Sequence, residues 1–133
     1  MNSIGWIVAH MAWHEQRYWL TRLAGATPVP ILNEVAARGG PATTPSLKAM
    51  RRAWSIVTTV ADPYLDTLDA AAMQGTLPGS PPRQYGNAIL RVTYHYWFHT
   101  GEILVIRQLL DHPRRPEFVG NIDDQAPYRP AGG

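Results

Sequence analysis

The 133-residue chain contains no cysteine, and this absence removes several kinds of chemistry. Disulfide bonds, thiolate metal ligands and a cysteine nucleophile are all excluded. A reaction at sulfur would therefore need a thiol that is supplied from outside the chain.

The chain also lacks a membrane-spanning run, a leader and a basic stripe. Its longest apolar run falls far short of the roughly 20 residues that a membrane span needs, and no basic, then apolar, then small-residue segment opens it. The net charge is only +2 and the basic residues are scattered, so no nucleic-acid surface is visible. We therefore expect a soluble cytoplasmic protein without a nucleic-acid or membrane partner.

Apolar residues, by contrast, are plentiful. Hydrophobic residues make up 45% of the chain, which includes five Trp and six Tyr. At this length, such a composition predicts one packed domain over residues 1–133 and excludes disorder of the whole chain.

Four of the five histidines form two pairs with helical spacing, His10 with His14 and His95 with His99. Residues four apart on a helix lie one turn above each other, about 6 Å apart, which is the spacing of a chelate. Glu102 falls about 20° from the direction of His95, and apolar side chains complete the same stripe: Ala88, Val92, Ile106 and Leu109. The second pair therefore faces the core.

Two core-facing imidazoles on one turn allow two interpretations. They are either polar groups hydrogen-bonded to a buried partner or ligands of one metal ion, and for a lone pair the first interpretation is favoured. A histidine on a second helix changes the balance in favour of a metal site.

Three segments have apolar residues at helical spacing and a cap or proline signal at one end. They lie near residues 3 to 24, 45 to 73 and 87 to 110. Asn2 or Ser3 can cap the first segment, and Gly25 can end it. Thr44 followed by Pro45 is a helix start for the second segment. The pattern predicts an all-α bundle, with no β-sheet beyond an isolated bridge.

The connections between these segments are expected to be irregular. Residues 25–44 form a long connection, which is either a lid over a site or a crossover link. Residues 74–86 contain three prolines and three glycines. Inside the second helix, Pro63 predicts either a kink near Val60 or a restart with Asp62 as the cap.

From about residue 112 the chain is rich in proline, glycine and charge, which predicts an irregular tail. We expect His112 to be solvated. Four residues of the tail are expected to dock back onto the bundle: Phe118, Val119, Ile122 and Tyr128.

Taken together, the motifs resemble the DinB/YfiT-like superfamily. Asn2-Ser3-Ile4-Gly5-Trp6 leads to His10 and then Glu15, and His95-x-x-x-His99-x-Gly101-Glu102-Ile103 precedes Arg107. The resemblance covers Asn2 to about Gly120. It implies an up-down four-helix bundle with a three-histidine metal site, in a superfamily that includes thiol-dependent S-transferases, a mycothiol-dependent isomerase and hydrolase-like proteins.

Carried over position by position, the resemblance assigns the metal ligands to His10, His95 and His99. His14 falls at a position that is usually apolar in the family and is not expected to bind the metal. Glu102 is the candidate catalytic residue, because it can orient His99 or a bound water. The alternative for Glu102 is a helix-face carboxylate that pairs with Arg91 or Arg17.

The chain departs from the family pattern at its start, where we expect the first helix to be absent: one residue precedes the Asn2-Ser3 turn instead of a whole helix. Either the start is misassigned or trimmed, or another chain covers the open face. We expect a homodimer that buries an apolar groove. The groove is expected to be lined by residues such as Trp6, Trp13, Tyr94 and Leu104.

Three neutral imidazoles with an open fourth position are typical of a catalytic site, and imidazole suits both Zn²⁺ and Ni²⁺. The resemblance therefore implies a metal-dependent enzyme that activates a small thiol, most simply an S-transferase acting on a small-molecule electrophile. Eleven of the twelve basic residues are arginine, which suggests a GC-rich genome without bearing on mechanism. The resemblance implies mycothiol as a candidate thiol. The alternatives are a metal-dependent hydrolase and a non-catalytic bundle that binds a metal or a small molecule.

Overall fold

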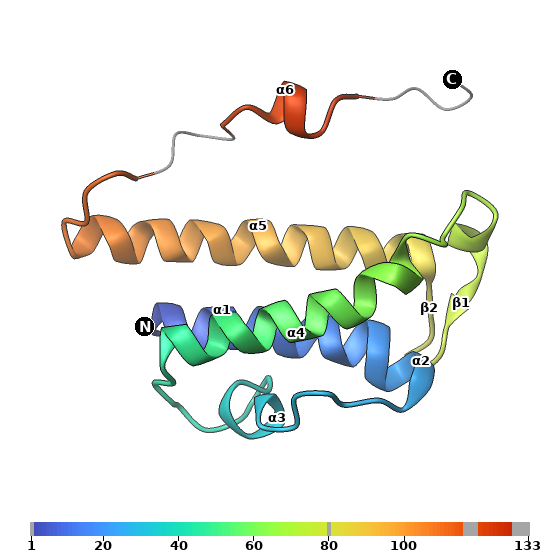
Figure 1. Cartoon of the computed structure of the whole chain (residues 1–133), viewed down its shortest axis with the longest axis horizontal. Coiled ribbons are helices and arrows are strands. Elements are labelled where there is room, and N and C mark those ends of the chain that lie inside the picture. Colours follow the sequence, from blue (N-terminus) through green and yellow to red (C-terminus); the bar gives the residue numbers. More distant parts are fainter. Residues whose placement is uncertain (1, 80, 116–119, 129–133) are drawn as a thin grey trace.

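Three long helical segments form the body of the molecule (Figure 1). The computed structural model describes residues 2–79, 81–115 and 120–128. In chain order the elements are α1 (Ile4–Glu15), the π-helix η1 (Gln16–Thr21), α2 (Arg22–Ala24), α3 (Leu32–Val35), α4 (Leu47–Leu65), the 3-10 helix η2 (Ala72–Gln74), β1 (Thr76–Leu77), β2 (Arg83–Gln84), α5 (Tyr85–Leu109) and α6 (Ile122–Gln125). The predicted all-α class is confirmed.

The first helical segment has the predicted ends. The Ser3 hydroxyl accepts a 3.1 Å hydrogen bond from the Trp6 backbone N–H, and Gly25 ends the segment in the left-handed conformation at φ 64°. The π-helix in its middle was not predicted. Gln16 opens it with a buried side chain that bonds both backbone groups of Val29, at 2.8 and 3.2 Å. These two hydrogen bonds hold Val29 of the following connection against the first helical segment.

That connection is a crossover link, as the second interpretation of residues 25–44 predicted. It returns along the bundle, so that α4 starts beside the start of α1, where the Pro45 carbonyl packs on Gly5. Consequently α1 and α4 run in the same direction, against the predicted up-down alternation, and α5 runs antiparallel to both (Figure 1). Leu32 of α3 is fully buried in the core. Truncating such a side chain to alanine costs about 2–5 kcal/mol.

The start of α4 lies later than predicted. The helix begins at Leu47, and Ser46 occupies the N-cap position without a side-chain hydrogen bond. Thr44 and Pro45 precede the helix because the Pro45 backbone packs against Gly5 at the start of α1. The prediction that Thr44 caps this helix was therefore wrong.

The end of α4 lies earlier than predicted. The helix continues through Pro63 and ends at Leu65, rather than near residue 73. Proline lacks the N–H that would bond the preceding turn and its ring crowds that turn, yet the helix continues through Pro63 before it ends. A restart with Asp62 as the cap was wrong.

Residues 74–86 contain a small hairpin, which corrects the expectation of an irregular segment without β-sheet. β1 and β2 pair antiparallel, with Thr76 opposite Gln84 and Leu77 opposite Arg83. Strands of two residues are too short for an alternating pattern to be visible in the sequence. Leu77 is fully buried and attaches the hairpin to the core.

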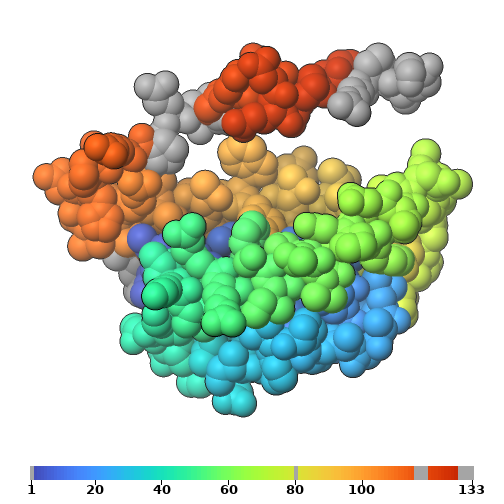
Figure 2. Space-filling model, viewed as in Figure 1, coloured from blue at the N-terminus to red at the C-terminus, as the bar shows by residue number. Residues whose placement is uncertain are grey.

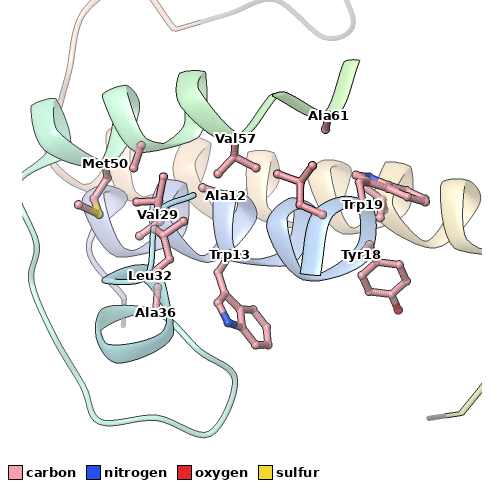
Figure 3. Close-up of a cluster of buried hydrophobic side chains, with 14 of the residues drawn as sticks. Ala12, Trp13, Tyr18, Trp19, Val29, Leu32, Ala36, Met50, Val57 and Ala61 are labelled. Atoms are coloured by element: carbon pink, nitrogen blue, oxygen red, sulfur yellow. The ribbon is translucent and has the colours of Figure 1, made fainter. Parts of the chain in front are cut away.

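The helix α1 is at the centre of the bundle and packs against α3, α4 and α5. Figure 2 shows α4 in front and α5 along one side, with little of α1 visible between them. In Figure 3, Val29 and Leu32 of the crossover and Met50 and Val57 of α4 gather around α1. A second, smaller cluster lies near the C-terminal end of α5, where Ile106 packs with Ile7 and Met11 of α1.

The groove predicted to be open is largely closed by the crossover. Trp13 is buried and its Nε1 donates a 2.9 Å hydrogen bond to Asn33 Oδ1. Trp6 and Leu104 are half-buried, and Tyr94 alone of the four expected groove residues is exposed. The exposed apolar face lies instead along the outside of α5.

The described part of the tail contains the one-turn helix α6 (Ile122–Gln125). Ile122 and Tyr128 are exposed, so the prediction that they dock on the bundle was wrong, whereas His112 is exposed as predicted. Phe118 and Val119 lie outside the described residues. None of the described helices is both long and apolar enough to cross a membrane.

Candidate metal centre

Three histidines from two helices meet in the interior of the bundle. His10 of α1 faces His95 and His99 of α5, and one ring nitrogen from each lies within 4.8 Å of the others. The ring centroids of His10 are 5.1 Å from His95 and 5.2 Å from His99. Because α1 and α5 are antiparallel neighbours, the middle of one helix meets the middle of the other, and residues far apart in sequence become adjacent.

The backbone of the crossover fixes the orientation of His10. Its Nδ1 lies 2.7 Å from the Ala36 carbonyl oxygen, and both residues are buried. Since a carbonyl oxygen only accepts hydrogen bonds, Nδ1 carries the proton and Nε2 keeps its lone pair. The free nitrogen is therefore the one available to a metal.

His99 is held in the same tautomer by a carboxylate. Its Nδ1 lies 2.5 Å from Glu102 Oε2, one turn further along α5. The Nδ1–H donates to the carboxylate, and Nε2 lies 3.0 Å from His95 Nε2. In the described part of the chain, Glu102 pairs with His99 and not with Arg91 or Arg17.

A model of the DinB superfamily matches residues 1–103. The chain belongs to the DinB superfamily. The matched range includes all three clustered histidines and Glu102. No curated protein and no solved structure matches the chain.

The donor set of this DinB superfamily member fits a divalent ion. Imidazole nitrogen binds Zn²⁺ at about 2.0–2.1 Å, so nitrogens within 4.8 Å of one another need only small side-chain movements to share one ion. Two of the three rings have the proton on the nitrogen that faces away from the cluster. Such hydrogen bonds from the distant nitrogen are typical of metal-ligating histidines.

The surroundings of His10 and His95 favour the neutral imidazole, which is the form that binds metals. Burial lowers the pKa of His10, and the neighbouring His99 adds to this. Burial, followed by the neighbouring His99 and His10, lowers the pKa of His95 to about 4. Protons therefore compete poorly for the His10 and His95 nitrogens at neutral pH.

His14 lies beside the cluster without belonging to it. It is buried, its ring centroid is 4.1 Å from that of His95, and it is not among the three grouped ligands. Burial, and then the nearby His95 and His10, lower its pKa to about 3. Its Nδ1 has no hydrogen-bond partner among the described residues, and His14 lines the same cavity as the three histidines.

Sequence reasoning missed two parts of this site in the DinB superfamily member. The first is the Ala36 carbonyl, because a backbone acceptor has no residue-type signal. The second is a set of arginines around the histidines, which come from separate segments of the chain and of which only Arg17 and Arg91 were considered, as alternative partners of Glu102. They line a shared cavity: Arg17, Arg22, Arg38, Arg83 and Arg91.

Proposed function

We propose that this DinB superfamily member is a metal-dependent enzyme in which His10, His95 and His99 hold one divalent ion, Zn²⁺ or Ni²⁺. The observation that supports this is the convergence of three buried or half-buried imidazoles, two of them oriented through their Nδ1 atoms. A structural zinc site is normally closed by four protein ligands, whereas a catalytic site keeps one position open. The three-nitrogen set matches the catalytic type.

The chemistry that such an ion supplies when bound is activation of a thiol or a water by lowering its pKa at neutral pH. The residues of the chain position the reactants. Glu102 accepts a hydrogen bond from His99 Nδ1–H and orients that ring. We therefore assign Glu102, the predicted catalytic residue, the role of positioning His99. Its side chain is 38% exposed and is not among the residues that line the cavity beside the histidines, so Glu102 acts through His99.

We propose a small thiol, such as mycothiol, as the nucleophile and a small electrophile as the second substrate. The chain has no cysteine, so the sulfur must come from a separate molecule. The thiol sulfur would form a bond to the electrophilic carbon, the leaving group would depart with its electron pair, and the thiol proton would pass to water. Low-molecular-weight thiols stay reduced in the cytoplasm, where we place the protein.

The cavity beside the histidines has room for small reactants. Its volume is about 470 Å³, which is within the range of about 300–1,000 Å³ for small-molecule sites. Trp6 and Trp13 supply aromatic walls, with the Trp6 ring stacked on His10 at 4.8 Å. A small reactant bound there would lie against the three imidazoles.

A thiol-consumption assay tests this proposal. Mycothiol and a panel of small electrophiles are incubated with the protein after treatment with a chelator and after addition of Zn²⁺ or Ni²⁺. Metal-dependent loss of free thiol, absent in His95→Ala, supports the transferase. Metal-dependent ester or amide cleavage without thiol loss would show a hydrolase instead. No reaction with any substrate despite bound metal would favour a non-catalytic binding protein.

A further inference from the structure

The cavity that contains the three histidines has an unusual distribution of charge. Five arginines line it, and no aspartate or glutamate does. They come from η1, α2, the crossover, β2 and α5, so the whole fold is needed to bring them together: Arg17, Arg22, Arg38, Arg83 and Arg91.

These arginines have no carboxylate partner in the part of the chain that the structure describes. The side-chain ion pair found there joins His99 to Glu102. Arg22 Nη1 and Arg83 Nε are buried atoms without a hydrogen-bond partner among the described residues. Buried polar groups are normally paired, and an unpaired one costs free energy. An anion in the cavity would remove that cost.

Arg22 is held in place by its surroundings. Its Cζ lies 4.8 Å from the centroid of the Tyr18 ring. Gly79, between β1 and β2, has φ +126°, and a Cβ at this position would lie 3.0 Å from Arg22 Nε and 3.1 Å from its Cζ. A residue with a side chain would push the guanidinium away, so the glycine lets the hairpin backbone press against Arg22.

The other arginines add positive charge to the cavity, and none of the described carboxylates lines the cavity to neutralise it. Burial, together with the nearby Arg17 and Arg83, lowers the pKa of Arg22, although an arginine remains charged in proteins. Arg17 Cζ lies 5.3 Å from the centroid of the Trp13 ring. Stacking of this kind fixes the plane of a guanidinium, and a fixed plane favours two-pronged binding of carboxylate or phosphate.

We infer that the cavity binds the oxyanion group, carboxylate or phosphate, of a small organic substrate through Arg22 and Arg83, with the rest of that molecule directed toward the three histidines. This inference rests on the proposed function for the identity of the reacting site, but the anion site itself requires only the arginines. Mycothiol has no carboxylate or phosphate, so the anionic group belongs to the electrophile.

A solvated basic patch is the alternative explanation of the arginines. It would tolerate loss of any one charge with little effect, and it would attract anions in proportion to charge alone. A built site differs in two ways: it saturates at one anion per chain, and it depends on Arg22 and Arg83 more than on other arginines.

Calorimetric titration of the full chain with succinate and, separately, with inorganic phosphate tests the inference. Succinamide is the uncharged control ligand. We expect saturable one-to-one binding of at least one of the two anions, and at least a tenfold loss of affinity in Arg22→Gln and in Arg83→Gln. Arg51→Gln is the matched control, because Arg51 is exposed on α4 outside the cavity. Which anion binds more tightly distinguishes carboxylate from phosphate.

Equal affinity in Arg22→Gln, Arg83→Gln and Arg51→Gln, or no saturable binding of either anion, would overturn the inference. If Arg22→Gln fails to fold by circular dichroism, Arg83→Gln and Arg22→Lys supply the comparison. Titrations are run with chelator-treated and metal-loaded protein, and bound metal is measured separately. Metal without anion binding refutes the anion site alone, whereas anion binding without metal refutes the proposed function alone.

Discussion

His99 and Glu102 lie one turn apart on α5, and their Nδ1 and Oε2 atoms are 2.5 Å apart. This contact fixes the His99 tautomer so that Nε2 faces His10 and His95. The Ala36 carbonyl acts on His10 in the same way from the other side of the site. One carboxylate and one backbone carbonyl thus orient two of the three imidazoles before any ligand arrives.

Replacing Glu102 tests the importance of that orientation. In Glu102→Gln the amide oxygen can still accept from Nδ1–H, but its negative charge is lost, so we expect metal affinity to fall by about 10- to 100-fold. Competition with a coloured chelator measures the affinity. Glu34→Gln, at an exposed position on α3, is the control and is expected to bind as wild type does. Unchanged affinity in Glu102→Gln would show that the carboxylate has no role in positioning the ligand.

Two glycines are predicted to respond in opposite directions to substitution by alanine. A Cβ on Gly5 would clash with the Pro45 carbonyl oxygen, and relieving such a clash costs about 1–3 kcal/mol of stability. A Cβ on Gly101 would meet no neighbouring atom within 4 Å, so Gly101→Ala should stabilise α5 by about 0.5–1 kcal/mol. Urea unfolding of both variants measures the difference. A Gly5→Ala protein as stable as wild type would contradict the close packing of α1 on α4.

Glu15 should make stability depend on pH. Burial raises its pKa above the usual 4.5, a nearby Asp62 adds to this, and contacts with Tyr96 and Trp19 oppose it in part. Because the folded state holds the proton more tightly than the unfolded state, stability falls as pH rises from about 4.5 through the folded pKa and is then constant. Glu15→Gln should therefore be more stable than wild type at pH 7 and lose that advantage near pH 4. A gain that is equal at both values would rule out this carboxylate as the cause.

The exposed apolar face of α5 predicts self-association. Leu90, Tyr94, Trp97 and Val105 are between 49% and 69% exposed, and they lie on one side of the helix around Gly101. Apolar patches of this kind are rarely left in water, so we propose a two-fold dimer through α5, which leaves the metal site inside each subunit. Light scattering should show a dimer that becomes monomeric in Val105→Glu. Val60→Glu on α4 is the control. A wild-type monomer at micromolar concentration that binds no hydrophobic dye would contradict the proposal.

The sequence predicted the helices better than their arrangement. The Ser3 cap, the Gly25 stop and the 3.6-residue spacing are local signals, and the structure follows them closely. The parallel course of α1 and α4 was missed, because it depends on the length and packing of the crossover. At Pro63 the sequence allowed more than one outcome, and α4 continues through this residue before it ends.

The candidate site was predicted only in part, because local spacing is visible in the sequence whereas tertiary packing is not. The i,i+4 spacing of His95 and His99 is visible in one helix, and the resemblance supplied His10 as the third member of the cluster. The Ala36 carbonyl and Arg83 come from the crossover and the hairpin, which have no periodic signal. Their place beside the histidines follows from tertiary packing alone.

Metal analysis of the protein purified without an affinity tag tests the central claim most directly. The account predicts one divalent ion per chain in the wild type, its loss in the His95→Ala, His99→Ala double variant, and its retention in His112→Ala, where the histidine is exposed and outside the cluster. Circular dichroism of each variant shows whether the bundle is intact. Stoichiometric metal in the folded double variant, or none in a wild type given Zn²⁺ and Ni²⁺, would contradict the account.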